Sequence, residues 1–167
     1  MTLSREDTEA AYRKHRELHE AREWAAIAEL FAHDGVYSEP FFGRIEGRDA
    51  IRKFLVKSMT GLEEWTFPFD SITIDEGRVV THWWNRLPGR RRGGGYFEFR
   101  GISTITYDEH GRIAHQLDFY DRIQALHVIA EARSSVVERA VLGVVQLVRP
   151  VMMGTHWLIA NTTERGR

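Results

Sequence analysis

Hydrophobic residues in the first part of the chain recur three or four positions apart, which is the spacing of helices that bury one face. Ser4 precedes the acidic residues Glu6 and Asp7 and favours a helix start, because its hydroxyl can cap free backbone N–H groups. Asp34 and Gly35 predict the end of a second helix. The apolar positions of these two predicted helices include Ala11, Tyr12, Leu18, Trp24, Ile27, Leu30 and Phe31.

After these helices the pattern changes to short strands. Residues 36–39 predict a first strand that Pro40 ends, and Gly47 and Asp49 predict the start of a third helix. Beyond Trp65, alternating stretches are separated by glycine-containing turns, which favours antiparallel hairpins. The strands predicted there span residues 71–75, 79–87, 96–107 and 113–120. Helices first and consecutive strands afterwards predict an α+β fold.

The composition is that of a globular protein and sets limits on its partners. The chain has 167 residues, of which 43% are hydrophobic and 28% charged, and this fits one ordinary domain. The formal net charge of -1 provides no excess positive field, so we expect no nucleic-acid partner. Cysteine is absent, which excludes disulfides, thiolate zinc sites and a cysteine nucleophile. The polar N-terminus differs from a secretory signal, and we expect a cytoplasmic protein.

Three segments together resemble the nuclear transport factor 2-like superfamily. Residues 27–37 contain a Leu-Phe pair followed by an acidic turn and a strand, residues 47–51 match a Gly-x-x-Ala-Ile helix start, and residues 111–121 are similar to the superfamily's last strand. The resemblance implies a curved antiparallel sheet wrapped on N-terminal helices, forming a cone with an internal pocket. We therefore expect this cone over residues 1–125 and a C-terminal helical extension over 126–167, within the same domain.

Two carboxylates are the main catalytic candidates. Side chains alternate across a strand, so Tyr37 and Glu39 share one side, as do Gln116, Asp118 and Tyr120. The resemblance implies that both sets face the pocket. Glu39, followed by proline, falls where ketosteroid isomerases have their general base, and Tyr37 and Glu39 fall where limonene epoxide hydrolases hold a water. Asp118 falls where those hydrolases carry a catalytic carboxylate. In an apolar pocket such a pair can exchange protons, because desolvation and mutual repulsion raise one pKa.

Residues on neighbouring elements complete the predicted site. His82 is expected to donate a hydrogen bond to a substrate oxygen, together with the two tyrosines. Ser103 and His15 stand where ketosteroid isomerases have a protonated Asp and a first-helix Tyr. His82 and Trp84 occupy the region where epoxide hydrolases carry an Arg and a second Asp, so neither catalytic set is complete. The predicted apolar wall consists of Trp84, Phe99 and Ile105.

Each candidate also has a structural interpretation. Asp118 is alternatively a buried, hydrogen-bonded carboxylate that orients a helix end, and Glu39 a solvated residue at the rim of the cone. His82 is alternatively a strand histidine that is satisfied by a neighbour. Asp121 is expected to cap the turn after the last strand, and the alternative for His15 is packing or a surface position.

We expect neither a metal nor a cofactor. His15 and His19 have the i, i+4 spacing of a cation-binding pair, but no further ligand accompanies them, and we interpret them as a solvated helix face. Three arginines and three glycines at residues 90–95 match no phosphate-loop pattern and instead predict a long hairpin loop.

The C-terminal segment is long and apolar. Valine-rich residues 136–148 predict a helix, and apolar residues continue beyond Arg149 and Pro150. These two residues, with Gln146 and His156, interrupt the run and disfavour a membrane-spanning helix. An interfacial helix is the alternative. We expect the segment to cover the mouth of the pocket or to form a subunit seam, and the protein to be a homodimer.

Three functional hypotheses follow from these patterns. The first is general acid/base catalysis on a hydrophobic small molecule such as a steroid, terpenoid or polyketide, of the isomerase, cyclase, dehydratase or epoxide hydrolase type. The second is non-catalytic binding of a similar small molecule by the same fold. The third is a partner-binding or oligomerisation module that works through the valine-rich segment. The pocket residues must decide among them, because one fold supports many functions.

Overall fold

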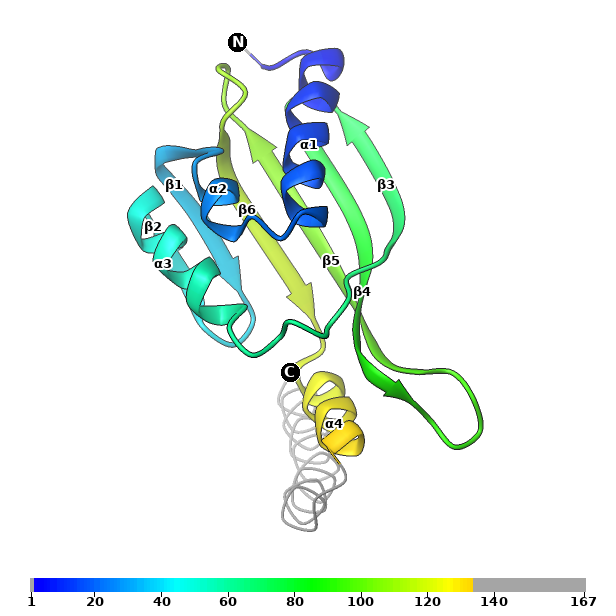
Figure 1. Cartoon of the computed structure of the whole chain (residues 1–167). Helices are drawn as coiled ribbons and strands as arrows, with labels where there is room; N and C mark the ends of the chain where they lie inside the picture. Colours follow the sequence, from blue (N-terminus) through cyan, green and yellow to red (C-terminus); the bar gives the residue numbers. More distant parts are fainter. Residues whose placement is uncertain (1, 134–167) are drawn as a thin grey trace, which may run out of the picture. The chain divides into compact units, whose positions relative to one another are not determined.

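The computed structural model describes residues 2–133. The chain divides into two units, which meet between residues 122 and 123. Figure 1 shows the elements of the first unit, with the helix α4 beginning at its end. In chain order the elements are α1 (Arg5–Glu20), α2 (Trp24–Ala28), β1 (Phe31–Glu39), β2 (Gly43–Glu46), α3 (Arg48–Ser58), β3 (Phe69–Asp75), β4 (Arg78–Arg90), β5 (Tyr96–Tyr107), β6 (Ile113–Tyr120) and α4 (Arg122–Arg133).

The strands form one curved, unclosed sheet in the order β2-β1-β6-β5-β4-β3. The strands β3 to β6 pair as consecutive antiparallel neighbours, as the turn sequences predict, whereas β1 pairs with β6 in parallel. The helices α1, α2 and α3 lie on one face of the sheet, which we call the inner face (Figure 1). The predicted α+β cone fold is thus confirmed.

The hydrophobic core lies between the inner face and the three helices. Phe31, Ile51 and Ile113 have no exposed surface, and neither has Val79. Burying a side chain of this size stabilises the fold by about 1.5–3 kcal/mol, so four of them form a substantial anchor. They come from β1, α3, β6 and β4, and the core therefore fixes three of the strands that carry the candidate site.

The helix predicted to end at Asp34 is shorter than the sequence pattern indicates. The helix α2 ends at Ala28, and Phe31 already belongs to β1, where it pairs with Ile113 of β6. The prediction is wrong because the apolar spacing of residues 27–31 continues from a helix into a buried strand. Gly35 permits the irregular pairing that follows, since a Cβ atom there would lie 3.0 Å from two backbone oxygens.

The edge strand β2 was not predicted from the sequence. Its four residues show no apolar alternation, and only Ile45 is partly buried. The hairpin predicted around residues 90–95 is present, because Arg90 at the end of β4 pairs with Tyr96 at the start of β5. The guanidinium of Arg86 lies 3.7 Å from the centre of the Tyr96 ring, a cation–π contact that ties the two strands together near the loop.

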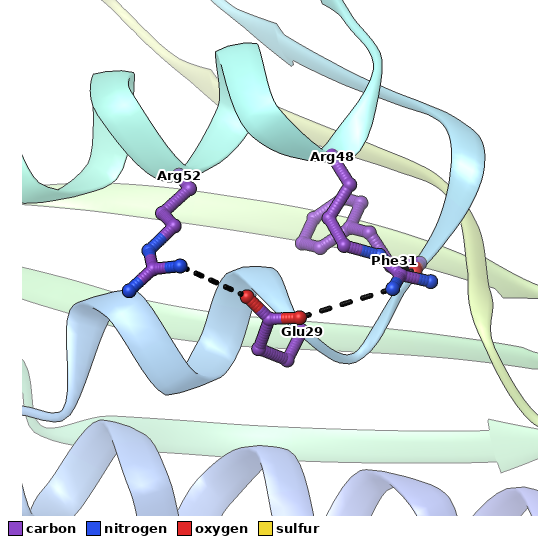
Figure 2. Close-up of polar contacts among 4 residues, drawn as sticks. All are labelled: Glu29, Phe31, Arg48 and Arg52. Carbon is purple, nitrogen blue, oxygen red and sulfur yellow. Dashed lines mark hydrogen bonds and ion pairs between the residues drawn. The ribbon is translucent and has the colours of Figure 1, made fainter.

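A polar clamp joins α3 to the turn between α2 and β1 (Figure 2). Glu29 forms ion pairs with Arg48 at 3.8 Å and with Arg52 at 3.5 Å. Arg48 also donates a hydrogen bond from Nε to the backbone oxygen of Phe31 at 2.9 Å. The exposed pair with Arg52 contributes little, but the Arg48 bond satisfies a backbone carbonyl at a strand start. The clamp therefore positions β1, which carries two of the predicted site residues.

The helix α4 extends past the predicted boundary between residues 125 and 126. The predictions placed on the valine-rich segment concern residues 134–167 and lie outside the described residues. Among residues 2–133, no helix is long and apolar enough to cross a membrane.

Candidate functional site

Strand register brings most of the predicted site residues onto the inner face. Thr81 of β4 pairs with Ser103 of β5, which in turn pairs with Asp118 of β6, and all three are buried. On the far side of β6, Tyr37 of β1 pairs with Gln116. Because side chains alternate along a strand, residues two positions away from these face the same side. The predicted residues on this face are Tyr37, Glu39, Phe99, Ser103, Ile105, Gln116, Asp118 and Tyr120.

Asp118 is a buried carboxyl group surrounded by hydrogen-bond donors. Its side chain is 9% exposed and accepts bonds from Ser103 Oγ at 2.6 Å, from Gln116 Nε2 at 3.1 Å and from Tyr37 Oη at 2.5 Å. Burial raises the pKa of Asp118 above its ordinary value of 3.8, since the charged form loses its hydration. The three donors oppose this shift, and the charge of Glu39 adds to it. The result is a carboxyl group whose proton is held more tightly than in water.

Tyr37 extends from β1 to this carboxyl group. It is 5% exposed, and burial together with the neighbouring charge of Asp118 raises the pKa of its hydroxyl well above 10. The hydroxyl therefore stays protonated and donates to Asp118 at any physiological pH. This bond from the neighbouring strand β1 fixes the orientation of the Asp118 carboxyl group.

A second carboxylate lies at the end of β1. Tyr120 of β6 donates from its hydroxyl to Oε1 of Glu39. The other oxygen, Oε2, accepts from the backbone N–H groups of Phe41 and Phe42 at 2.7 and 2.9 Å. Burial, with the Glu39 charge beside it, raises the pKa of Tyr120. The ring of Tyr120 packs against Phe99 at a centroid distance of 5.4 Å, so this pair sits beside aromatic surface.

Trp83 supports the site from β4, although sequence reasoning did not single it out. Its indole nitrogen donates to Ser103 Oγ at 2.9 Å, and Ser103 in turn donates to Asp118. The ring lies against Gly101 of β5, where a Cβ atom would come within 2.6 Å of the indole carbons. Glycine at this position thus lets the large ring lie flat over the sheet.

His82 and Trp84 lie on the other face of the sheet, so the prediction that they face the pocket is wrong. His82 pairs with Ile102 and shares a hydrogen bond of 2.7 Å with Ser71 Oγ of β3. The guanidinium of Arg100 lies 5.0 Å from the Trp84 ring. In an alternating strand an error of one residue exchanges the two faces, and Trp83 occupies the inner position instead.

His15 is packed inside the protein, as its alternative interpretation predicts, and His19 is half-buried, so the interpretation of the pair as a solvated helix face is wrong. His15 is 7% exposed and stacks on Tyr12 at 5.8 Å, and His19 contacts the rings of Trp24 and Phe67. Burial lowers the pKa of His15 to about 3 and that of His19 to about 4. Both are therefore neutral at pH 7. Among residues 2–133, no three His, Cys, Asp or Glu side chains gather as a metal site.

A groove of about 310 Å³ lies between α1 and β3, away from the predicted site residues. Its lining is mainly charged, and it includes Arg13, Arg16 and Glu17. None of the predicted site residues borders it, and Ile105, predicted as apolar wall, is instead a core residue with 1% exposure.

Comparison with known proteins agrees with this architecture. The model of the SnoaL-like domain family matches residues 12–116, which is more than half of the chain. No curated protein matches the chain. Three solved structures illustrate the fold, and all are less than 25% identical, so they bear on the fold alone.

The first is a protein described as a candidate ketosteroid isomerase from Kribbella flavida DSM 17836, with 21% identity, a TM-score of 0.54, and coverage of 70% of this chain and 79% of that one. The second is described as a candidate SnoaL-like polyketide cyclase from Shewanella putrefaciens CN-32, with 14% identity, a TM-score of 0.59, and coverage of 74% and 86%. The third is TerC co-crystallised with polyporic acid, with 16% identity, a TM-score of 0.60, and coverage of 74% and 98%. The chain belongs to the SnoaL-like domain family, and it has the fold of nuclear transport factor 2-like proteins.

Proposed function

We propose that this protein is an enzyme that transfers protons on a hydrophobic small molecule, with Asp118 as the proton-carrying group. The observation that carries the proposal is the environment of this carboxyl group. The group is buried, it accepts hydrogen bonds from three donors, and its pKa is raised. A carboxyl group with this property is a stronger base when ionised and still holds a proton closer to neutral pH. Perturbed carboxyl groups of this kind concentrate at functional sites.

The chemistry follows from the two carboxyl groups. The ionised Asp118 takes a proton from a carbon next to a carbonyl group, and the electron pair of that C–H bond moves toward the carbonyl oxygen to form an enolate. The protonated Asp118 then returns the proton to another carbon, which moves the double bond, or to a leaving hydroxyl group, which departs as water. Tyr120 has one O–H, which it donates to Glu39, so it stabilises the developing charge only when this hydroxyl turns from Glu39 to the substrate oxygen.

The substrate class rests on the aromatic surroundings and on the family. Phe99, Tyr120 and Trp83 present rings on the inner face, and such surfaces suit flat apolar ligands. Structures with this fold include TerC, which was co-crystallised with polyporic acid. A steroid, terpenoid or polyketide fits these features.

The alternative is a binding protein without catalysis. One observation favours it, namely that both oxygens of Asp118 are already engaged by protein donors. In that case the carboxylate stays ligated and only shapes the pocket. The two functions differ in what loss of the carboxylate does: catalysis stops in the first, whereas binding persists in both.

The test compares Asp118→Asn with His82→Asn on a panel of β,γ-unsaturated keto steroids and polyketide-like ketones, followed by ultraviolet absorbance of the conjugated product. We expect the Asp118 variant to lose about 10²–10⁴-fold in kcat, the usual contribution of a general acid/base. The His82 variant lies on the other face and serves as the matched control, so it retains the wild-type rate. Ligand binding with no turnover by the wild type would favour the binding protein, and full turnover by the Asp118 variant would reject the proposal.

A further inference from the structure

Several buried polar atoms on or near the inner face have no hydrogen-bond partner among the described residues. Native proteins leave few such atoms, because each loses its hydration without compensation. Unpartnered polar atoms that gather on one face of a sheet therefore indicate contact with something other than the chain itself. They are Tyr12 Oη, His15 Nδ1, Arg16 Nε, Thr81 Oγ1, Asn85 Nδ2, Tyr107 Oη and Gln116 Oε1.

Three of these seven atoms have a local explanation. The hydroxyl of Thr81 lies close enough to Tyr12 to lower the pKa of Tyr12, and Tyr12 in turn raises the pKa of Tyr107. A hydroxyl can rotate to donate or to accept, so neighbouring hydroxyls satisfy one another with small movements. Asn85 differs, because its amide nitrogen can only donate and carries two N–H groups.

Asn85 is buried, and its register partner on β5 belongs to an aromatic cluster. The residue is 7% exposed and pairs with Phe99 on β5. The Phe99 ring contacts Trp65 on one side, at 6.4 Å, and Tyr120 on the other, at 5.4 Å. The amide nitrogen of Asn85 has no acceptor among the described residues, although a buried amide requires one. An oxygen atom of a ligand would supply the missing acceptor.

We propose that Asn85 binds an oxygen at the end of the ligand opposite the reacting centre. Asn85 and Asp118 lie on the same face, four residues apart along the strand direction and two strands apart. At about 3.3 Å per residue and 4.8 Å per strand, their Cα atoms are roughly 16 Å apart. After both side chains and a hydrogen bond at each end are allowed for, a ligand on the order of 10 Å long spans the gap.

The surface between the two residues is aromatic. Trp83 lies between Thr81 and Asn85 on β4, and its ring is spread over Gly101. This flat ring forms a floor on which a ligand of several fused or linked rings can lie. The ligand class is therefore a flat polycyclic molecule with a keto or hydroxyl oxygen at each end. This inference rests on the proposed function for the Asp118 end and adds the recognition of the distant oxygen.

The experiment measures affinity, which is independent of turnover. Its probes are a saturated four-ring steroid diketone with one carbonyl at each end and the two corresponding monoketones, titrated by calorimetry. The wild type is expected to bind the diketone about 10-fold to 100-fold more tightly than either monoketone, since a buried donor left unpaired weakens binding by that factor. Asn85→Leu should remove this preference, and Thr81→Val, on the same strand and face, should keep it.

The outcomes separate this inference from the proposed function. A wild-type preference for the diketone that persists in Asn85→Leu would overturn the role of Asn85, and so would equal binding of all probes by the wild type. Thermal unfolding of Asn85→Leu provides a second measurement, because removal of an unpartnered buried amide should leave the melting temperature unchanged or raise it. A large fall would show that the amide is bonded within the protein, which also contradicts the proposal. The turnover assay of Asp118→Asn tests the proposed function independently of these binding measurements.

Discussion

Acid should destabilise this protein through His15 and His19, and the size of the effect follows from their burial. Each has an ordinary pKa of 6.5 in the unfolded chain, and burial lowers the folded values to about 3 and about 4. A lowered folded pKa of a base means that stability is complete above pH 6.5 and is lost as pH falls toward the folded value. At pH 5 the unfolded state binds protons that the folded state does not.

The magnitude can be worked out from these values. When the pH falls from 7 to 5, it ends about 1.5 units below the pKa of 6.5 of a histidine in the unfolded chain. Each unit corresponds to about 1.36 kcal/mol of unfolding free energy. Each histidine therefore contributes about 2 kcal/mol of lost stability over this interval, and the two together contribute about 4 kcal/mol. Typical domains have about 5–15 kcal/mol in total, so the loss is large.

The assay is urea unfolding at pH 7 and pH 5 of the wild type, His15→Leu and His110→Gln. Replacing His15 by leucine should reduce the loss of stability between the two pH values by about 2 kcal/mol. His110 is exposed, with 68% of its side chain accessible, and His110→Gln serves as the control replacement of a surface histidine. Contributions of groups that are common to the three proteins and distant from the replaced residue cancel in the differences. A His15→Leu variant that keeps the wild-type pH dependence would show that His15 does not link acid to unfolding.

Further predictions concern the support of the site. Gly101→Ala should destabilise the fold by about 1–3 kcal/mol in urea unfolding, because its Cβ atom overlaps the Trp83 ring, while Gly93→Ala, in open space, should be neutral. The unfolding free energy of Asp118→Asn should rise relative to that of the wild type as the pH increases from 3.8 through the pKa of folded Asp118. The reason is that the raised pKa makes ionisation of Asp118 unfavourable in the folded wild type. A difference in unfolding free energy that does not change with pH would contradict this. Tyr37→Phe should raise the pKa of Asp118 further in carboxyl NMR, because it removes one donor that lowers it.

The sequence was informative where a pattern is local. The hairpin strands were predicted almost residue by residue, because alternation and turn glycines are encoded within a few positions. The pairing of Tyr37, Glu39, Asp118 and Tyr120 on one face also followed from alternation once the resemblance gave their common direction. These residues do come together in the structure.

The errors arose where long-range packing decides. Residues 79–87 contain apolar side chains on both faces, so periodicity alone did not tell which of Trp83 and Trp84 faces inward. Leu87 and Val79, both buried, share the parity of Trp83, and Arg86 shares that of Trp84, which was the available signal. The burial of His15 has a local trace, because His15 lies three residues from both Tyr12 and Leu18 on the predicted apolar helix face, whereas the isolation of Asn85 depends on contacts with other elements.

Titration of the Asp118 carboxyl group shows whether this residue can carry a proton, and the measurement needs no substrate. Carbon-13 NMR of the labelled protein follows each aspartate carboxyl group with pH, and Asp118→Asn assigns the resonance. Burial beside Glu39 predicts a pKa above the ordinary 3.8 despite the three donors. A midpoint at or below 3.8 would mean that the donors outweigh burial, that the carboxylate is permanently ionised and ligated, and that Asp118 shapes the site without carrying a proton.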